Sequence, residues 1–327
     1  MPYFIIFLVF LSVIATALPM IPSYKWWIRI FDFPRAQVTV IAFLSIILTL
    51  IFCIDSPLLL YTLIPLSIGV ISYQSIKMIR YTPFYPIRSP KANLPIPDNS
   101  FSVLLANVKM DNDQYGELKE IIRKNDPDLV LLNEVDDKWL RELQELDRDF
   151  RYSIKYPQDN TYGMTLYSKL KLIDTKVNFL VDNTIPSIHT KVELRSGKII
   201  NFHGLHPEPP KPGSSTYERD TELLIVGKRI KNEDEPAILA GDLNDVAWSA
   251  TSELFQKRSG LWDPREGRGF FNTYNVFVPF FRYPLDHFFY TKDFLLISLS
   301  KLAKFGSDHF PILIKLEFDP KARTKID

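Results

Sequence analysis

PAILAGDLND, at residues 236–245, joins a short apolar run to two polar side chains, Asp242 and Asn244. An apolar run of this length, bounded by a glycine, is typical of a buried strand. Because side chains two apart in an extended chain point to the same side, both would be able to face one phosphate group. A single Asp-Asn pair more often caps a turn, so the pattern gains meaning only from its repetition elsewhere.

The same arrangement recurs along the rest of the chain, where several apolar runs end in polar side chains. These are FSVLLA (101–106) followed by Asn107, DLVLL (128–132) followed by Asn133 and Glu134, KIINF (198–202) followed by His203 and His206, and the later pairs Asp286-His287 and Asp308-His309. Four of the five histidines fall in these clusters, and the fifth, His189, is expected to be structural.

Short strands outnumber helices in this part of the chain. We expect strands near 101–106, 128–134, 164–168, 175–181, 188–194, 198–203, 236–240, 286–290, 294–300 and 311–318, and helices near 113–124, 137–146 and 216–231. Apolar residues at helical spacing support the first helix, which Pro127 ends. Many strands with few helices predict an α+β fold of packed sheets flanked by helices.

Three uncharged apolar runs occupy the first quarter of the chain, at about 3–22, 36–54 and 57–76. A helix needs about 20 apolar residues to cross the hydrocarbon core of a bilayer. The first run is marginal, because Pro19 and Pro22 lie near its end. A cleaved signal peptide is the alternative for this run, but it lacks the basic segment that such peptides carry. We therefore expect residues 1–80 to form a bundle of about three transmembrane helices.

Basic residues flank these runs unequally. Lys25, Arg29 and Arg35 follow the first run, four more lie within 77–91, and the turn at 55–56 has none. Cytoplasmic loops of membrane proteins are enriched in lysine and arginine. The pattern predicts a multi-pass integral membrane protein whose N-terminus is outside and whose C-terminal domain is cytoplasmic.

The remaining chain divides by composition. Residues 81–99 contain five prolines and predict a semi-rigid linker, followed by a soluble domain at 100–319 and a tail at 320–327. After residue 90 there are 33 basic and 36 acidic residues, a net charge of −3. This balance disfavours a high-affinity nucleic-acid binder, although it leaves room for a local basic groove.

The polar residues at the strand ends suit metal-assisted hydrolysis. Hard cations such as Mg²⁺ prefer carboxylate and carbonyl oxygens, which Glu134, Asp242, Asp308 and Asn107 would supply. The sequence has no cysteine cluster or histidine triad that would indicate zinc. Phosphoester hydrolysis needs an activated water and neutralised phosphate charge, and a carboxylate beside a histidine fixes the tautomer of its imidazole.

At these residues the chain resembles the endonuclease/exonuclease/phosphatase superfamily, which includes DNase I-like nucleases, inositol-polyphosphate 5-phosphatases and bacterial sphingomyelinases. The matching stretches, in the order of the family, are LLANVKM (104–110), PDLVLLNEV (127–135), HGLHPEPP (203–210), GDLND (241–245), LDHFF (285–289) and GSDHFPI (306–312). Together they cover nearly the whole soluble domain. The resemblance implies a four-layer α/β/β/α sandwich, here in a membrane-anchored bacterial type.

The resemblance also implies which residues hold the metal. Glu134 would be the principal Mg²⁺ ligand, with Asp308 as a second acidic ligand and Mn²⁺ as the alternative ion. Asn107 would support the metal or bind phosphate. One departure lies beside this site, because the family commonly has glutamine where this chain has Asn133.

The catalytic roles follow from the same resemblance. Asp242 would position or deprotonate the attacking water, and Asn244 would stabilise the transition state. His309 would bind the scissile phosphate, with Asp286 orienting it. His206 would contact the phosphate or the leaving group.

Two histidine assignments need a choice. His203 and His206 both lie near the expected end of a strand, and we favour His206 because the prolines after it should end the strand and expose it. His287 neighbours Asp286, but adjacent side chains alternate along a strand, so we expect it to be structural.

Arg219 would either form a local ion pair or reach phosphate, and we favour the local role.

The expected function is therefore a membrane-anchored, Mg²⁺-dependent phosphoester hydrolase in which water attacks phosphorus in line. Nucleic acid and phospholipid remain open as substrates. The membrane helices and the net charge of −3 favour a lipid or sphingomyelin-type phosphodiester, whereas the breadth of the family favours nucleic acid. A non-catalytic scaffold that binds phosphorylated ligands is the alternative from another class. The lipid bilayer is the only other partner expected, and no protein partner is predicted.

Overall fold

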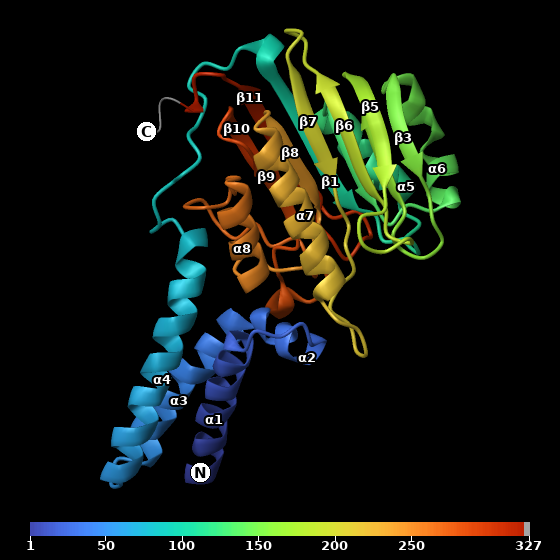
Figure 1. Ribbon diagram of the computed structural model, residues 1–327. Coiled ribbons are helices and arrows are strands. Elements are labelled where there is room, and N and C mark those ends of the chain that lie inside the picture. The colour runs from blue at the N-terminus through green and yellow to red at the C-terminus, as the bar shows by residue number, and fades with distance from the viewer. Residues whose placement is uncertain (324–327) are drawn as a thin grey trace.

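Two β-sheets pack face to face, and helices cover their outer faces, in a computed structural model that describes residues 1–323 (Figure 1). The first sheet has the strand order β10-β11-β1-β2-β4-β3, and the second has the order β5-β6-β7-β8-β9. The predicted tail at 320–327 lies outside the described residues from 324 onward. The four-layer α/β/β/α sandwich expected from the sequence is confirmed.

The strands and helices of the sandwich follow the sequence pattern closely. The strands are β1 (Ser100–Asn107), β2 (Leu129–Asn133), β3 (Tyr152–Tyr156), β4 (Met164–Ser168), β5 (Lys171–Asn178), β6 (Ser187–Glu193), β7 (Ile199–Gly204), β8 (Ala237–Asp242), β9 (Asp286–Tyr290), β10 (Phe294–Lys301) and β11 (Ile312–Phe318). The helices are α5 (Tyr115–Asn125), α6 (Asp137–Glu142), α7 (Tyr217–Glu233) and α8 (Ala250–Ser259).

Alternation along the central strands divides the core into layers. Leu105 of β1 points between the sheets and packs in one cluster with Phe202 of β7 and Ile238 of β8. Its neighbour Leu104 points outward, into a cluster with Trp139 of α6. A fully buried side chain of this size contributes about 1.5–3 kcal/mol relative to an exposed one. The two faces of β1 are therefore both buried, which explains its uninterrupted apolar run.

The sequence patterns did not predict the bounds of one edge strand, and they did not predict a second edge strand or α8. The strand expected at 175–181 begins four residues earlier, at Lys171, and β3 and α8 were not predicted. β5 and β3 lie at the ends of their sheets, and most of their side chains are at least partly exposed. Edge strands bury little apolar surface, so their sequences carry a weak alternation signal. α8 begins instead at a polar cap, where the Ser249 side chain accepts a hydrogen bond from Ser252 N.

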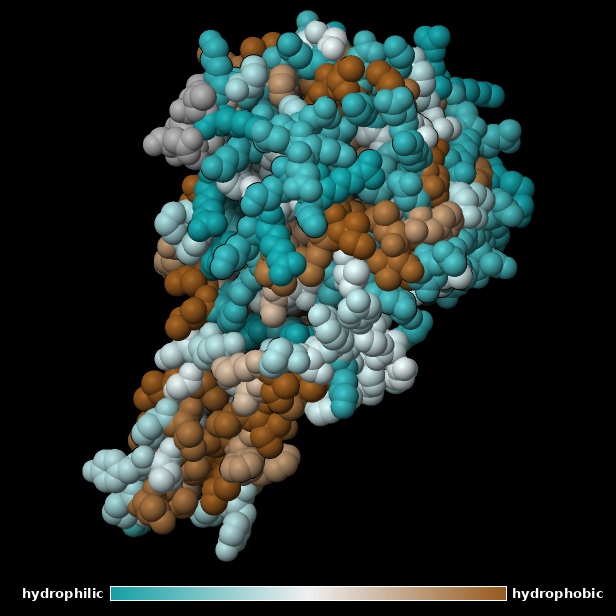
Figure 2. All heavy atoms as spheres, viewed as in Figure 1, coloured by the Kyte–Doolittle hydropathy of each residue, from teal (hydrophilic) through white to brown (hydrophobic). Residues whose placement is uncertain are grey.

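Three N-terminal helices project from the sandwich, and their surfaces are predominantly apolar (Figures 1 and 2). They are α1 (Pro2–Ala17), α3 (Arg35–Phe52) and α4 (Pro57–Met78), with the short helix α2 (Trp26–Arg29) between the first two. With the turns that follow α1 and α4, each is long and apolar enough to cross a membrane. The helices expected at 3–22, 36–54 and 57–76 are thus present, and whether they span a bilayer stays a prediction.

The helical bundle packs directly against the sandwich. Trp248 Nε1 donates to the backbone oxygen of Asp32 at 2.8 Å, and Thr216 N donates to the backbone oxygen of Tyr24 at 2.8 Å. Lys77, near the end of α4, forms an ion pair with Glu253 of α8 at 2.8 Å. The segment between α1 and α3 is therefore fixed against the soluble domain.

The proline-rich segment 81–99 also contacts the sandwich. Leu296 N of β10 donates to Pro90 O at 2.9 Å, and Ala92 N donates to Leu296 O at 3.0 Å. β10 is an outer strand of the first sheet, so this segment covers part of an otherwise open edge. The segment is extended, as its prolines predict, but it is held against the domain by these hydrogen bonds.

Glu222 on α7 gives the fold a pH-dependent element. Burial raises the pKa of its carboxyl group to about 8, and the nearby Asp182 carboxylate adds to the shift. Since the folded-state pKa lies above the unfolded one, this group stabilises the fold below about pH 4.5. That stabilisation is lost as the pH rises through about 8.

We expect Glu222→Gln to be more stable than the wild type at pH 9, by a few kcal/mol at roughly 1.4 kcal/mol per pKa unit. Near pH 5 the two proteins should be almost equal. Thermal unfolding of the full chain in detergent at both pH values measures the difference. The control is Glu218→Gln, an exposed glutamate on the same helix. Equal pH dependence in the wild type and Glu222→Gln would contradict the prediction.

Candidate active site

The site lies where β1, β2, β8 and β9 meet at one end of the two sheets. Asp242, the last residue of β8, pairs across the antiparallel ladder with Asp286, the first residue of β9. Asn107, the last residue of β1, pairs with Asn133 of β2, directly before Glu134. The packing of the two sheets brings these strand ends together, although they are far apart in the sequence.

The backbone at two strand ends is unusual in ways that direct the polar side chains. A Cβ atom at Gly241 would lie 1.8 Å from the backbone oxygen of Leu205, so only glycine fits this close approach. Glu134 and Asn244 both have positive φ values, of 63° and 51°. Such values are uncommon for residues other than glycine and cluster at functional sites.

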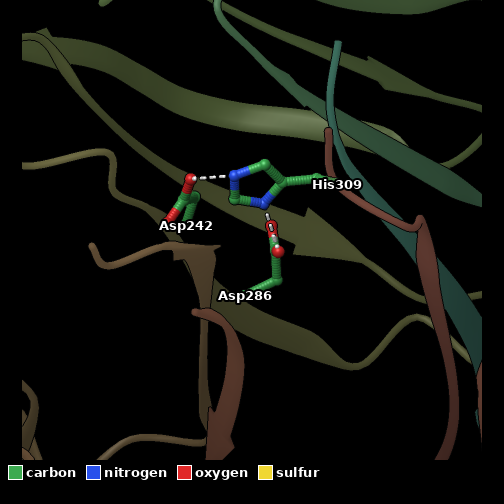
Figure 3. A group of neighbouring side chains, drawn as sticks. All are labelled: Asp242, Asp286 and His309. Atoms are coloured by element: carbon green, nitrogen blue, oxygen red, sulfur yellow. Dashed lines mark hydrogen bonds and ion pairs between the residues drawn. The ribbon is translucent and has the colours of Figure 1, made fainter. Parts of the chain in front are cut away.

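His309 lies between two aspartates (Figure 3). Its Nδ1 atom is 2.8 Å from Asp286 Oδ2, and its Nε2 atom is 3.5 Å from Asp242 Oδ2. Burial alone would lower the pKa of His309, but the two carboxylates outweigh it and raise the pKa to about 10. The imidazole is therefore protonated at neutral pH and offers a positive charge next to Asp242.

Asp242 is almost completely buried, and burial is the main cause that raises the pKa of its carboxyl group. Asp286 raises it further, whereas His309 lowers it. Its oxygens accept hydrogen bonds from Asn107 Nδ2 at 3.0 Å and from the backbone N–H of Asn244 at 3.0 Å. A carboxylate with a raised pKa is a stronger base than an exposed aspartate.

Asn107 connects this group to Glu134. Its Nδ2 donates to Glu134 Oε1 at 2.8 Å as well as to Asp242, and its Oδ1 accepts from the backbone N–H of Lys109. His206 Nε2 lies 4.0 Å from Glu134 Oε1, and its Nδ1 lies 3.2 Å from the backbone oxygen of Asp242. Asn107 thus fixes two carboxylates, and its predicted contact with a metal stays a prediction.

Glu134 and Asp308 form the acidic part of the site. Burial raises the pKa of Asp308, and the charge of Glu134 raises it further, which shows that the two carboxylates lie within electrostatic reach. Within residues 1–323 neither carboxylate forms an ion pair with a lysine or arginine. Two carboxylates that have no lysine or arginine ion pair among the described residues suit a hard divalent cation, so they fit the predicted metal.

A second group, Asp242, Asp286 and His309, also has ligand atoms that lie within 4.8 Å of one another and could hold a metal ion. Both ring nitrogens of His309, however, already face carboxylate oxygens, Nδ1 at 2.8 Å and Nε2 at 3.5 Å, so each is placed to donate a proton. A protonated imidazole has no free lone pair for a metal. These contacts suit a hydrogen-bonded catalytic group, and the placement of the metal at Glu134 and Asp308 stays a prediction.

The structure separates the histidines that the sequence left ambiguous. His203 Nδ1 pairs with His189 Nδ1 at 2.7 Å, and burial holds the pKa values of both below the usual range, so both are neutral. His206, in contrast, faces Glu134 and Asp242. His287 contacts Arg265 and the backbone oxygen of Asp245, in keeping with the structural role expected for it.

Three further side chains support the site without having been assigned to it from the sequence. Arg219 Nη1 donates to the backbone oxygen of Asn244 at 2.9 Å, a local contact that agrees with its predicted structural role. Ser307 Oγ donates to the backbone oxygen of Asn107 at 2.7 Å and ties the Asp308-His309 loop to β1. The Tyr274 ring lies 4.9 Å from the His309 ring. Tyr274 and Ser307 lie in irregular loops without periodicity, so no pattern points to them.

These residues open into one cavity of about 720 Å³, a size typical of small-molecule sites. Five predicted site residues line it, namely Glu134, Asp242, Asn244, Asp308 and His309. The remaining lining is largely apolar and includes residues from the segment between α1 and α3. No sequence pattern predicted this apolar wall.

Comparison with known proteins identifies the family of this chain. The sequence matches the Endonuclease/Exonuclease/phosphatase family over residues 104–309. No curated protein shows a significant match to the chain.

Several solved structures share the fold at low sequence identity. D. rerio TDP2 complexed with a single-strand DNA product has 19% identity and a TM-score of 0.57, covering 67% of this chain and 100% of that one. A family protein from Bacteroides thetaiotaomicron has 19% identity and a TM-score of 0.57, covering 69% and 99%. The human Nocturnin catalytic domain with bound sulfate has 17% identity and a TM-score of 0.55, covering 69% and 96%.

Proposed function

Because this chain belongs to the endonuclease/exonuclease/phosphatase family, we propose that it is a membrane-anchored, Mg²⁺-dependent phosphoester hydrolase in which water attacks phosphorus in line. The observation that carries the proposal is His309 held between Asp242 and Asp286, in the cavity that Glu134 also lines. Asp242, His309 and Glu134 line one cavity, where they would serve as the base, the positive charge and the metal-binding carboxylate.

Each residue has a role that its contacts support. Asp242 accepts the proton of the attacking water, because its buried carboxyl group has a raised pKa. His309 donates a hydrogen bond to a phosphate oxygen and neutralises part of its charge, and Asp286 holds the imidazole in place. Asn244 stabilises the charge that develops on the phosphate in the transition state. Its backbone N–H bonds Asp242, and its side chain bonds Pro207 O.

Glu134 and Asp308 would hold the divalent cation, with Asn107 fixing the orientation of Glu134. A bound Mg²⁺ supplies Lewis-acid polarisation of the phosphate and neutralises its charge. His206 lies on the same side of the site as Glu134 and would contact the phosphate or the leaving oxygen. All eight side chains predicted from the sequence thus have a place in this proposal.

The membrane anchor completes the proposal. The three N-terminal helices that are long and apolar enough to cross a bilayer lie together at one end of the molecule. The basic segment before α3 and the sandwich lie at the same end of the bundle, opposite Met1 (Figure 1). Under the charge rule for membrane proteins, we propose that the catalytic domain faces the cytoplasm.

Metal dependence provides the direct test. We expect the full-length protein to hydrolyse bis-p-nitrophenyl phosphate, an oligonucleotide or a phospholipid with Mg²⁺, and to lose that activity in EDTA. Glu134→Gln should raise the half-saturating Mg²⁺ concentration by at least about tenfold, because it removes a charged oxygen ligand. Glu142→Gln, an exposed glutamate on α6, is the control. Activity that persists in EDTA would exclude the metal, and no hydrolysis of any substrate would favour a binding scaffold.

A further inference from the structure

The cavity at the active site has two chemically different ends. Its polar end holds the catalytic carboxylates and His309. Its other wall is formed by Ile30, Phe31 and Phe33, which precede α3, and by Val278 and Phe281 of the loop before β9. A substrate that fills the cavity must therefore be polar at the phosphate and apolar beyond it.

The residues that line the cavity also disfavour a nucleic acid as the substrate. None of the residues that line the cavity is a lysine or an arginine. Proteins that bind nucleic acid neutralise successive phosphates with such residues. Aromatic rings can stack on bases, but this wall also contains Ile30 and Val278, which offer no such surface. The wall fits hydrocarbon better than a nucleotide.

The apolar wall lies next to the N-terminal end of α3, one of the three helices that are long and apolar enough to cross a membrane. Residues 30–34 directly precede α3, and Gln37 in the first turn of α3 donates a hydrogen bond to the backbone oxygen of Phe280. The adjoining loop exposes two aromatic side chains, Phe277 at 60% and Phe280 at 84%. Large exposed apolar side chains next to a membrane helix are placed to contact lipid.

From these observations we propose that the substrate is a membrane lipid that carries a phosphate ester in its headgroup, an inference that rests on the proposed hydrolase function. The phosphate would lie between Glu134 and His309, and the apolar part of the lipid would lie against Phe31 and Phe281. A cavity of about 720 Å³ is suited to the phosphate and the adjoining carbons, with the long chains remaining in the bilayer. The segment directly before α3 thereby forms part of the substrate site.

The reaction on a phosphodiester lipid is balanced with water alone. The water oxygen forms a bond to phosphorus, and one phosphorus–oxygen ester bond breaks. Asp242 takes one proton from the water, and after the ester bond breaks that proton is returned through solvent to the departing alkoxide, which becomes the alcohol. The products are one alcohol and one phosphomonoester, and no oxidant or further co-reactant is required.

The first experiment compares lipid chains at constant headgroup chemistry. The full-length protein is assayed with Mg²⁺ on vesicles of phosphatidylglycerol, phosphatidylethanolamine, phosphatidate and sphingomyelin. Short-chain analogues that dissolve as monomers, bis-p-nitrophenyl phosphate and a single-stranded oligonucleotide are assayed in parallel. We expect at least one long-chain lipid to exceed its short-chain analogue in kcat/KM by at least about tenfold, because burying hydrocarbon contributes to binding.

The second experiment tests the wall itself. Phe31→Ser and Phe281→Ser should each reduce the ratio of long-chain to short-chain kcat/KM by about tenfold or more. The matched control is Ile199→Ser, because Ile199 is 49% exposed, close to the 52% of Phe281, and lies at the opposite end of β7 from His206. That control should leave the ratio unchanged.

The outcomes separate this inference from the function on which it rests. Hydrolysis of a long-chain lipid, with a ratio that falls in the two phenylalanine variants alone, supports the inference. Mg²⁺-dependent cleavage of the oligonucleotide or the soluble diester without any lipid cleavage overturns the lipid substrate and leaves the hydrolase intact. An unchanged ratio in both variants overturns the role of the wall. No hydrolysis of any substrate overturns both proposals.

Discussion

Asp242→Asn is expected to lower Mg²⁺-dependent hydrolysis by about three orders of magnitude or more, the range observed when a general base and a charged transition-state contact are removed together. The substitution removes the group that accepts the proton of water. It also places an amide beside His309 Nε2, which now faces a carboxylate at 3.5 Å. The protonated form of His309 would lose one of its two stabilising charges, so its pKa should fall.

The fold should survive this change because asparagine has nearly the same shape. The amide oxygen can keep one of the two hydrogen bonds that Asp242 accepts, either from Asn107 Nδ2 at Oδ2 or from Asn244 N at Oδ1, so we expect only a modest loss of stability. Thermal unfolding and size-exclusion chromatography of the variant check this point before rates are compared. Asp137→Asn, an exposed aspartate in the first turn of α6, serves as the matched control. Retention of more than about a tenth of wild-type turnover would contradict the role of Asp242 as base.

Asp286→Asn should reduce turnover by about a hundredfold and shift its pH dependence. In the wild type, the carboxylates of Asp286 and Asp242 overcome burial and hold the pKa of His309 at about 10. His309 therefore donates its proton to a phosphate oxygen across the neutral and mildly alkaline range. Without Asp286, burial is opposed by one carboxylate fewer, so the pKa of His309 should fall.

Only the protonated form of His309 can donate a hydrogen bond to the phosphate, so activity should fall as His309 loses its proton. Wild-type activity should decline as the pH rises through about 10, and the decline in Asp286→Asn should occur at lower pH. His309→Gln should show low activity without this alkaline limb. A pH–rate series for the three proteins at saturating Mg²⁺ measures the shift. Superimposable alkaline limbs in the wild type and Asp286→Asn would show that Asp286 does not control His309.

The N-terminal helices are held against the sandwich at several points. A free linker would let the catalytic domain move away from its helices, as proline-rich segments often permit. Here Trp248 and Thr216 bond the backbone between α1 and α3, and Lys77 of α4 pairs with Glu253. Phe33 packs edge-on against Tyr283 with ring centroids 5.4 Å apart. The active-site cavity therefore has a fixed orientation relative to the helices.

The sequence by itself determined the parts of this protein that depend on local periodicity. Short apolar runs over 101–106 and 236–240 locate two buried strands, and the polar residues that follow them identify Asn107 and Asp242, because a strand end must leave the core. Helix length and the absence of charge identify α1, α3 and α4, since a bilayer requires about 20 apolar residues. Edge strands such as β3 bury little apolar surface, so sequence patterns do not predict them.

Only the tertiary structure decided which of these residues meet. His203 and His206 are three residues apart with similar local patterns, but the first pairs with His189 across β6 and β7 and the second faces Glu134. Phe31 and Phe281 are separated by 250 positions in the sequence, yet both line the cavity that holds Asp242. Such contacts arise from the packing of distant segments, which no periodicity within one segment can encode. The apolar wall that favours a lipid substrate is formed by such contacts between distant segments.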